Sequence, residues 1–179
     1  RPAFGRAVRR LAVVAKQPPK VEADARLLLV ADTQAALEAL GRAARARAQG
    51  RIIAITGSVG KTGTKEALKT VLARQARAFA SSGSLNNHWG VPLSLSRMPA
   101  DSDYGIFELG MNHPGEIAAL TRMVRPHVAV ITTIEPAHLG FFPSVEAIAD
   151  AKAEIFRGVE RGGAAILNRD NPHYARLAK

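Results

Sequence analysis

An apolar run at residues 51–56 leads directly into a glycine-containing turn, and the turn leads into a helical pattern that starts near Lys61. A strand followed by a short turn and a helix is the first half of a βαβ unit. Apolar runs and helical patterns continue to alternate along the chain, which favours a mostly parallel sheet with helices on its faces. We therefore predict an α/β fold.

The spacing of apolar residues places each element along the chain. Strands are predicted at residues 11–15, 27–31, 51–56, 76–80, 104–109, 127–134 and 163–168. Helices are predicted at residues 33–49, 61–77, 92–97, 114–124 and 144–159, and another begins at residues 171–172. We expect the first two strands to be buried, and we expect Pro92 in the first turn of its helix. A change in charge and motif content places a domain boundary near residue 50.

The charge of the chain is high and unevenly distributed. Its 25 Lys and Arg residues and 15 Asp and Glu residues give a formal net charge of +10, which by itself suggests a nucleic-acid or membrane partner. The whole excess lies in residues 1–77, however, and residues 78–179 are close to neutral. The absence of cysteine excludes disulfide scaffolds and cysteine-based zinc sites. No apolar run approaches the ~18 residues that a membrane-spanning helix needs.

The turn at residues 56–62 reads Thr-Gly-Ser-Val-Gly-Lys-Thr and has the composition of a phosphate-binding loop. Glycines allow backbone N–H groups to turn towards an anion, and the N-terminus of the following helix adds its positive dipole end. Lys61 can reach the phosphates of a nucleotide, and the hydroxyl of Thr62 can bind Mg²⁺. The usual pattern has a glycine five positions before Gly60, where this chain has Ile55. A strand–helix turn with a surface lysine is therefore the alternative.

Polar residues follow several of the predicted strands. Ligands of open α/β sheets bind beyond the carboxyl ends of the strands. The residues at such ends include Glu108, His138, Asn168 and Asp170. A carboxylate beside nucleotide phosphates is a hard oxygen ligand for Mg²⁺, which makes Glu108 the leading candidate. Taken singly, Glu108 could be a solvated acid and His138 a loop histidine with one hydrogen bond, but their common position favours a shared site.

One lysine falls on the apolar side of the predicted helix at residues 144–159. At about 100° per residue, Lys152 lies between Ile148 and Ile155, whereas Glu154 lies with the acidic residues on the opposite side. Lysine is seldom buried without a partner. Either its ammonium group reaches water, or burial or a nearby metal lowers its pKa. A neutral lysine amine can react with CO₂ to form a carbamate, which could position Mg²⁺.

Residues 85–92 read Leu-Asn-Asn-His-Trp-Gly-Val-Pro and contain the only tryptophan of the chain. The side-chain amides of Asn86 and Asn87 offer both donors and acceptors to a polar substrate. The same residues would also suit a turn that caps the next helix, and composition leaves both interpretations open.

Together these motifs resemble the Mur ligase family of ATP-dependent amide-forming enzymes of peptidoglycan synthesis. The segments that carry the resemblance are TGSVGKTGTKE (56–66), GSLNNHWGVPLSL (83–95), ELGMNHPGEI (108–117), PAHLGFF (136–142), AKAEIF (151–156) and LNRDNP (167–172). Within the family, the chain is most similar to the ligases that add D-alanyl-D-alanine. The resemblance is strong over residues 51–179 and weaker over residues 1–50, and the shortened phosphate loop is the form that this family uses.

The resemblance implies a role for each motif residue. The residues that would bind ATP are Gly57, Ser58, Val59, Gly60, Lys61, Thr62 and Asn112. Those that would hold Mg²⁺ are Thr62, Glu108, His138 and Lys152, the last as a carbamate. The catalytic group would be Lys61, Glu108, His138 and Lys152, while Asn86 and Asn87 would lie near the UDP-linked substrate. No role is carried over for Asn168 and Asp170.

The resemblance also implies the reaction, the partners and the domains. The full-length enzyme would use ATP and Mg²⁺ to add D-alanyl-D-alanine to UDP-N-acetylmuramoyl-tripeptide through an acyl phosphate. It would be a cytoplasmic bacterial monomer without nucleic-acid or membrane partners. Residues 1–50 would be the end of a small α/β N-terminal substrate-binding domain with its linking helix. Residues 51–179 would be an incomplete central ATP-binding domain, without the C-terminal domain and inactive alone.

Two alternatives to this ligase remain open. One is another Mur-type or folylpolyglutamate-synthase-like amide ligase, although the segment LNN-x-x-GVPL argues against it. The other is a non-catalytic basic module that binds a nucleotide or a nucleic acid through the phosphate loop. The nucleic-acid module would bind DNA or RNA with a strong dependence on salt.

Overall fold

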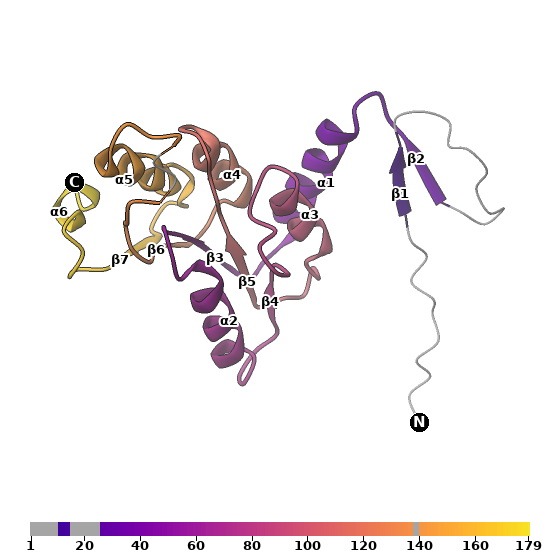
Figure 1. The fold of residues 1–179 in the computed structure, drawn as a ribbon. Helices are drawn as coiled ribbons and strands as arrows, with labels where there is room; N and C mark the ends of the chain where they lie inside the picture. The colour runs from indigo at the N-terminus through magenta and orange to yellow at the C-terminus, as the bar shows by residue number, and fades with distance from the viewer. Residues whose placement is uncertain (1–10, 15–25, 138–139) are drawn as a thin grey trace.

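The computed structural model describes residues 11–14, 26–137 and 140–179. Within these ranges the chain forms a five-stranded sheet and a two-stranded sheet, and every strand pair is parallel (Figure 1). Parallel neighbours require crossover connections, and in the five-stranded sheet helices supply them. The predicted α/β fold, a mostly parallel sheet flanked by helices, is confirmed.

At the centre of the larger sheet lies the strand that leads into the glycine-containing turn. Its strands are β3 (Arg51–Thr56), β4 (Ala78–Ala80), β5 (Tyr104–Glu108), β6 (Val128–Ile131) and β7 (Ala164–Leu167). Their order is β4-β5-β3-β6-β7. The chain therefore leaves β3 to one side of the sheet and later crosses to the other side. Such a change of direction marks the place where open α/β sheets bind their ligands, beyond the carboxyl ends of the strands.

Helices cover both faces of this sheet. They are α2 (Lys61–Leu72), α3 (Gly90–Arg97), α4 (Glu116–Val124) and α5 (Val145–Ala153), and α6 (Tyr174–Leu177) follows β7. On one face, Leu68 and Leu72 of α2 pack against Ile55 and its neighbours. On the other face, α3, α4 and α5 enclose the larger core, to which Leu95 and Ile117 belong. Figure 1 shows α2 on one side of the sheet and these helices on the other.

Helix α1 (Thr33–Arg47) packs against α3 and reaches α4. A Cβ atom added to Gly41 would lie 2.9 Å from the Cα of Pro92, so glycine permits the close approach of α1 and α3. The buried guanidinium of Arg45 donates to the carbonyl oxygens of Val124 at 2.6 Å and Arg125 at 2.7 Å. A cation at this place satisfies carbonyl groups that the C-terminal end of a helix leaves free. The domain boundary near residue 50 stays a prediction.

The smaller sheet pairs β1 (Leu11–Val14) with β2 (Arg26–Leu29). The sequence predicted that the second of these strands is buried, but Leu28 and Leu29 are 38% and 63% exposed. Among the described residues, β2 has β1 as its single partner strand. Strand side chains project from the faces of their sheet, so an apolar run is buried only where another layer packs on those faces. At 38% and 63% exposure, Leu28 and Leu29 lack such a cover among the described residues, and the predicted burial of this strand is wrong.

The helix predicted at residues 144–159 changes form part-way. It is α-helical to Ala153 and continues as the 3₁₀ helix η1 (Glu154–Gly158). A 3₁₀ helix has fewer residues per turn, which rotates the following side chains away from their α-helical directions. Glu154, predicted on the side opposite the apolar stripe, is only 7% exposed, because it accepts hydrogen bonds from the start of α4. The other predicted elements are present, and their ends shift by a few residues.

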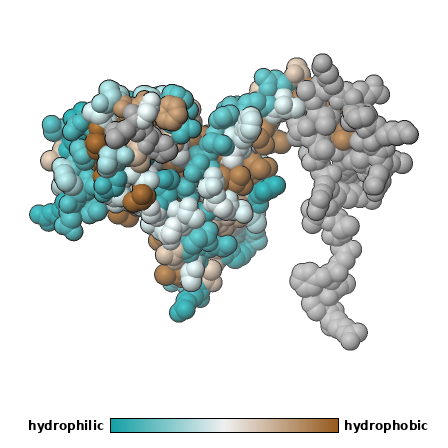
Figure 2. All heavy atoms as spheres, viewed as in Figure 1, coloured by the Kyte–Doolittle hydropathy of each residue, from teal (hydrophilic) through white to brown (hydrophobic). Residues whose placement is uncertain are grey.

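The visible surface is mostly hydrophilic. Figure 2 shows its hydrophobic residues in separate patches rather than in one continuous band. Of the helices in the described ranges, not one combines the length and apolar composition that crossing a bilayer requires. Two of the exposed large hydrophobic residues, Val59 and Trp89, lie in loops beside the site described next.

Candidate functional site

The carboxyl ends of β3, β5 and β6 bring the predicted site residues together. Thr56 is the last residue of β3, Glu108 is the last residue of β5, and Thr132 directly follows β6. Across the sheet, Ile55 is paired with Glu108 and Thr56 is paired with Ile131. The parallel register therefore places the glycine-containing turn, Glu108 and the segment after β6 at one edge of the sheet.

Two glycines shape the turn between β3 and α2. Gly57 has a φ of 146° and Gly60 a φ of 84°, in the region that other residues rarely adopt. A Cβ atom on Gly57 would also collide with Oγ1 of Thr132. That hydroxyl donates to the carbonyl oxygen of Val59 at 2.6 Å. The turn is therefore held tightly against the segment that follows β6.

Ser58 provides a second connection between these two segments. Its backbone N–H donates to the carbonyl oxygen of Thr133 at 2.9 Å. Its hydroxyl donates to the carbonyl oxygen of Glu135 at 3.0 Å and accepts from the N–H of the same residue at 2.9 Å. The backbone of the turn is thereby fixed before any ligand is bound, which favours recognition of an anion by N–H groups.

Lys61 begins α2 and folds back over the turn. Its ammonium group donates to the carbonyl oxygens of Gly57 at 2.8 Å and Ser58 at 3.4 Å. The N-cap residue Gly60 makes no side-chain cap, so N–H groups of the first helical turn keep capacity for a ligand. Burial lowers the pKa of Lys61, and the negative charge of Glu108 opposes this shift. A cation and a helix N-terminus at one place suit a phosphate group.

The carboxylate of Glu108 is 1% exposed and accepts one hydrogen bond on each oxygen. The hydroxyl of Thr62 donates to Oε2 at 2.8 Å. Nδ2 of Asn86 donates to Oε1, also at 2.8 Å. Each carboxylate oxygen keeps a further lone pair. The three residues therefore form an oriented group of oxygen ligands with acceptor capacity for a cation.

The second asparagine of the pair has a different partner. Oδ1 of Asn87 accepts from the backbone N–H groups of Trp89 at 3.1 Å and Gly90 at 2.9 Å, at the start of α3. Capping of the next helix was one of the two interpretations that the sequence left open. Asn112 is exposed, and its backbone N–H donates to the carboxylate of Glu116 at 2.7 Å.

A cavity of about 240 Å³ lies between these loops. Its lining includes Lys61, Asn86, Asn87, Asn112 and Lys152. A neighbouring cavity of about 320 Å³ shares Asn87 and Asn112 with it. The structure therefore brings together two lysines and three asparagines that the sequence had placed in four separate motifs.

Lys152 reaches this cavity from α5. It is 2% exposed, which agrees with burial, one of the two alternatives that the sequence left open. Burial, and secondly the positive charge of Lys61, lower the pKa of Lys152 from 10.5 to about 8. A lower pKa increases the fraction of neutral, nucleophilic amine at neutral pH. This is the form that reaction with CO₂ requires.

The remaining predicted metal ligand, His138, lies outside the described residues. Within the described ranges, no three His, Asp or Glu side chains are grouped so as to hold a metal ion. Mg²⁺ commonly takes one or two protein oxygens and completes its shell with substrate phosphates and water. The oxygens of Thr62 and Glu108, 2.8 Å apart beside the glycine turn, fit that type of site.

Residues 55–179 match the family model of the Mur ligase middle domain. The chain belongs to the Mur ligase family. A relative from Rickettsia prowazekii, UDP-N-acetylmuramoyl-tripeptide–D-alanyl-D-alanine ligase, is 42% identical over 166 residues, which cover 93% of this chain and 37% of the relative. The resemblance drawn from the motifs is therefore confirmed at the level of the family.

Two solved structures of Mur ligases have the same fold. A crystal structure of MurF from Acinetobacter baumannii has a TM-score of 0.80 and 42% identity, and the match covers 89% of this chain and 35% of that one. The MurF ligase of Thermotoga maritima, in complex with ADP, has a TM-score of 0.78 and 29% identity, covering 92% of this chain and 38% of that one. The chain spans about a third of the length of the curated relatives it matches.

Two polar residues of this Mur ligase domain were missed as site neighbours, although both lie in quoted motifs. Glu154 accepts hydrogen bonds from the backbone N–H groups of Gly115 at 2.8 Å and Ala118 at 3.0 Å, and so caps α4. Lys65 is 0% exposed. Both residues lie in the quoted motifs, but each reaches a partner on another element that the sequence does not reveal.

Asn171 is a third polar residue near the site that was missed from the sequence. Its Nδ2 donates to Oγ1 of Thr133 at 2.9 Å and to the carbonyl oxygen of Ile134 at 3.0 Å. It thus supports the segment after β6 that holds the glycine turn. The neighbouring Asn168 and Asp170 are exposed, and the side chain of Asn168 accepts from the backbone of Asp170 at 3.1 Å.

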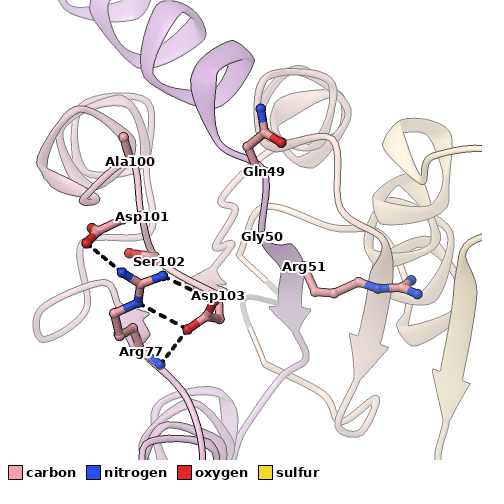
Figure 3. Close-up of a pocket in the computed structure, with 8 residues that line it drawn as sticks. All are labelled: Gln49, Gly50, Arg51, Arg77, Ala100, Asp101, Ser102 and Asp103. Carbon is pink, nitrogen blue, oxygen red and sulfur yellow. Dashed lines mark hydrogen bonds and ion pairs between the residues drawn. The ribbon is translucent and has the colours of Figure 1, made fainter.

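A separate cavity of about 380 Å³ lies at the amino end of β3, where Arg51 begins the strand (Figure 3). There Arg77 forms ion pairs with Asp101 at 2.8 Å and Asp103 at 3.3 Å. Figure 3 shows the side chain of Arg51 directed away from this group. The acids balance Arg77 and connect β4 to β5, so this opening is distinct from the Mur ligase site at the opposite end of the sheet.

Proposed function

We propose that this chain is the nucleotide-binding part of an ATP-dependent amide ligase that adds D-alanyl-D-alanine to UDP-N-acetylmuramoyl-tripeptide in peptidoglycan synthesis. The observation that carries the proposal is the 2.8 Å hydrogen bond between Thr62 and Glu108 beside the glycine turn. It places hard oxygen ligands next to Lys61 and the free end of α2. The relative from Rickettsia prowazekii that carries this ligase name supports the choice of substrates.

The nucleotide would lie with its phosphates in the glycine turn. The residues of the turn, Gly57, Ser58, Val59, Gly60, Lys61 and Thr62, would surround the phosphates, and Asn112 would lie nearby. Lys61 would exchange its two carbonyl partners for phosphate oxygens, which are better acceptors for a cation. The ADP complex of the Thermotoga maritima relative supports an adenine nucleotide as the ligand.

Mg²⁺, when bound, supplies positive charge between the phosphate oxygens. Thr62 and Glu108 would hold it, with His138 proposed as a further ligand. Asn86 would keep the carboxylate of Glu108 in one orientation by its hydrogen bond at 2.8 Å. Fixed orientation of ligands by outer groups is a general requirement of metal sites.

Lys152 would act as a carbamate. The ammonium group would first lose one proton to water. The neutral amine would then attack CO₂, forming an N–C bond and releasing a second proton to water, so that the loss of two protons converts a cation into an anion. The low exposure and the pKa of about 8 support this step. The anion would relieve the repulsion by Lys61 and give the cavity a further oxygen ligand for Mg²⁺.

The reaction itself needs positioning more than covalent help from the protein. The substrate carboxylate would attack the γ-phosphorus of ATP, giving an acyl phosphate and ADP. The amine of D-alanyl-D-alanine would then attack the acyl carbon, expelling phosphate and losing a proton. Lys61 and the end of α2 would stabilise the charge that builds on the phosphate oxygens. We place this chemistry in the cytoplasm, where ATP is available.

The test is release of ADP by the complete protein. The assay contains Mg-ATP and UDP-N-acetylmuramoyl-tripeptide, with and without D-alanyl-D-alanine, and L-alanyl-L-alanine serves as the matched control. We expect sustained ADP release only with the D,D-dipeptide. Release that is independent of the dipeptide, or equal with both dipeptides, would contradict the proposal. Salt-sensitive binding of DNA without ADP release would favour the nucleic-acid alternative.

A further inference from the structure

Lys65 is a buried cation without a role in the site as described. It lies in α2, one helical turn after Thr62, and its exposure is 0%. Lysine is almost never fully buried unless its charge has partners. Its Nζ donates to the carbonyl oxygen of Gly83 and lies 3.2 Å from a carboxylate oxygen of Glu66. The contact with Gly83 connects α2 to a loop of the site.

That loop connects β4 to α3 and carries Asn86. Gly83 has a φ of 53°, so the loop turns sharply where Lys65 holds it. Three residues further on, the carbonyl oxygen of Asn86 accepts from the N–H of Gly110 at 2.8 Å. The side chain of Asn86 reaches Glu108 from the same position. The position of the loop therefore determines the position of the side-chain amide of Asn86.

These contacts close a ring of hydrogen bonds. Helix α2 contributes Thr62 and Lys65, the loop contributes Gly83 and Asn86, and β5 contributes Glu108. Lys65 donates to the loop, the loop donates to Glu108 through Asn86 at 2.8 Å, and Thr62 donates to Glu108 at 2.8 Å. Thr62 and Lys65 lie on neighbouring turns of α2. A shift of the loop would therefore move the carboxylate of Glu108 through Asn86 and leave the helix in place.

We infer that Lys65 is a positioning residue: by holding Gly83 it fixes the amide of Asn86, and this amide orients Glu108 for the magnesium–nucleotide complex. The inference rests on the proposed function, because it concerns the magnesium side of that site. Lys65 is bound to the loop carbonyl and not to the glycine turn. Its loss should therefore weaken the effect of Mg²⁺ on nucleotide binding and leave metal-free binding unchanged.

The experiment measures ADP binding by titration calorimetry, once with Mg²⁺ and once with EDTA. The variants are Lys65→Met, which keeps the apolar stem and removes the ammonium group, and the control Lys69→Met, one turn further along α2 and exposed. We expect Lys65→Met to lose about tenfold in affinity for ADP with Mg²⁺, the size typical of outer groups of metal sites. Affinity with EDTA should change less than about twofold, and the control should match the wild type.

A double-mutant cycle separates positioning from general support of the fold. If Lys65 acts through Asn86, Lys65→Met should have little further effect on magnesium-dependent affinity in an Asn86→Ala background. A merely structural lysine would instead lower the affinity equally in both backgrounds and in both buffers. Circular dichroism establishes that each variant is folded.

The outcomes are distinct. Failure of the wild type to bind ADP in either buffer would overturn the proposed function and this inference with it. Magnesium-dependent binding by the wild type that is unchanged in Lys65→Met would overturn the inference alone. Should Lys65→Met not fold, Lys65→Gln takes its place: it keeps a polar end but is one bond shorter, so it loses the contact with Gly83. The same tenfold loss is then expected, and an unchanged affinity again overturns the inference.

Discussion

Lys61 and Lys152 line the same cavity, and the charge of Lys61 contributes to the low pKa of Lys152. Two ammonium groups facing one space repel each other, and burial of Lys152 adds the cost of desolvation. The electrostatic energy of the two lysines is therefore least favourable when no anion is bound in the cavity. Phosphate groups, or a carbamate on Lys152, would remove this unfavourable energy.

Replacement of Lys152 by methionine should stabilise the fold. Because the folded pKa of about 8 lies below the unfolded value of 10.5, the unfolded chain binds more protons between these pH values, and wild-type stability should rise with pH there. Below pH 8 the penalty is complete, so Lys152→Met should gain about 1–3 kcal/mol at pH 7. Urea unfolding at pH 7 and pH 9.5 in CO₂-free buffer measures both effects. Equal stability of variant and wild type at pH 7 would contradict this explanation.

Replacement of Lys61 by alanine should strongly weaken nucleotide binding. The ammonium group is the one side-chain cation at the glycine turn among the described residues, and its two carbonyl contacts place it over the turn. A charge-assisted hydrogen bond contributes about 1.5–3 kcal/mol, so the loss in affinity for Mg-ATP should exceed about tenfold. Titration calorimetry measures it, with Lys69→Ala as the exposed control on the same helix. An unchanged affinity in Lys61→Ala would exclude the phosphate-loop assignment.

Two glycine substitutions should have opposite effects. Gly57→Ala introduces strain at a φ of 146° and a collision with Thr132, and should cost about 1–3 kcal/mol of stability. Gly63 lies in the first turns of α2 with open space around it, so Gly63→Ala should stabilise by about 0.5–1 kcal/mol. Thermal unfolding of both variants tests the pair. Equal effects would mean that the turn is not held as described.

Loss of the Glu154 carboxylate should destabilise the start of α4. Glu154→Ala leaves the N–H groups of Gly115 and Ala118 without their partner, at a cost of about 1–3 kcal/mol. Glu154→Gln keeps one acceptor oxygen and should lose less. Chemical denaturation compares these variants with Asp170→Ala, an exposed acid. A loss no larger than in that control would show that the cap contributes little.

His127 should make the fold sensitive to acid. Its Nδ1 accepts from the backbone N–H of Ile52 at 2.9 Å, which requires a neutral ring, and burial together with Arg45 and Arg51 lowers its pKa. As the pH falls below about 6.5, the unfolded histidine binds a proton that the folded one does not, so stability falls. His127→Asn keeps an acceptor oxygen near Nδ1 and should reduce the difference between urea unfolding at pH 7.5 and pH 5.5. An unchanged difference would assign the acid sensitivity to other groups.

The parts of the site that follow from local patterns were predictable from the sequence. The strand, the glycine turn and Lys61 lie within a few residues of one another, and the burial of Lys152 follows from the helical period. The alternation of elements also gave the parallel sheet and placed Glu108 at a strand end. Sheet order was not predictable, because it depends on which strands pair rather than on any single strand.

The contacts that orient the site could not be read in this way. Glu108, Gly83 and the start of α4, which Asn86, Lys65 and Glu154 contact, lie on other elements. The sequence does not show which group such a side chain will reach. The burial of Glu154 also depends on α4, whose first N–H groups it caps across the fold. The exposure of Leu28 shows the same limit, since an apolar run predicts a strand but not what covers it.

Helix α1 also contacts the site loop at its first turn. Nε2 of Gln34 donates to the carbonyl oxygen of His88 at 2.9 Å, while Arg45 near the other end is bound to the C-terminal end of α4. A helix of 15 residues is roughly 22 Å long at 1.5 Å per residue and does not bend easily. It thus connects the residues before Thr33 mechanically to the loop of Asn86 and Asn87. A displacement of Thr33 and the residues next to it would therefore reach the side of the cavity that Asn86 and Asn87 line.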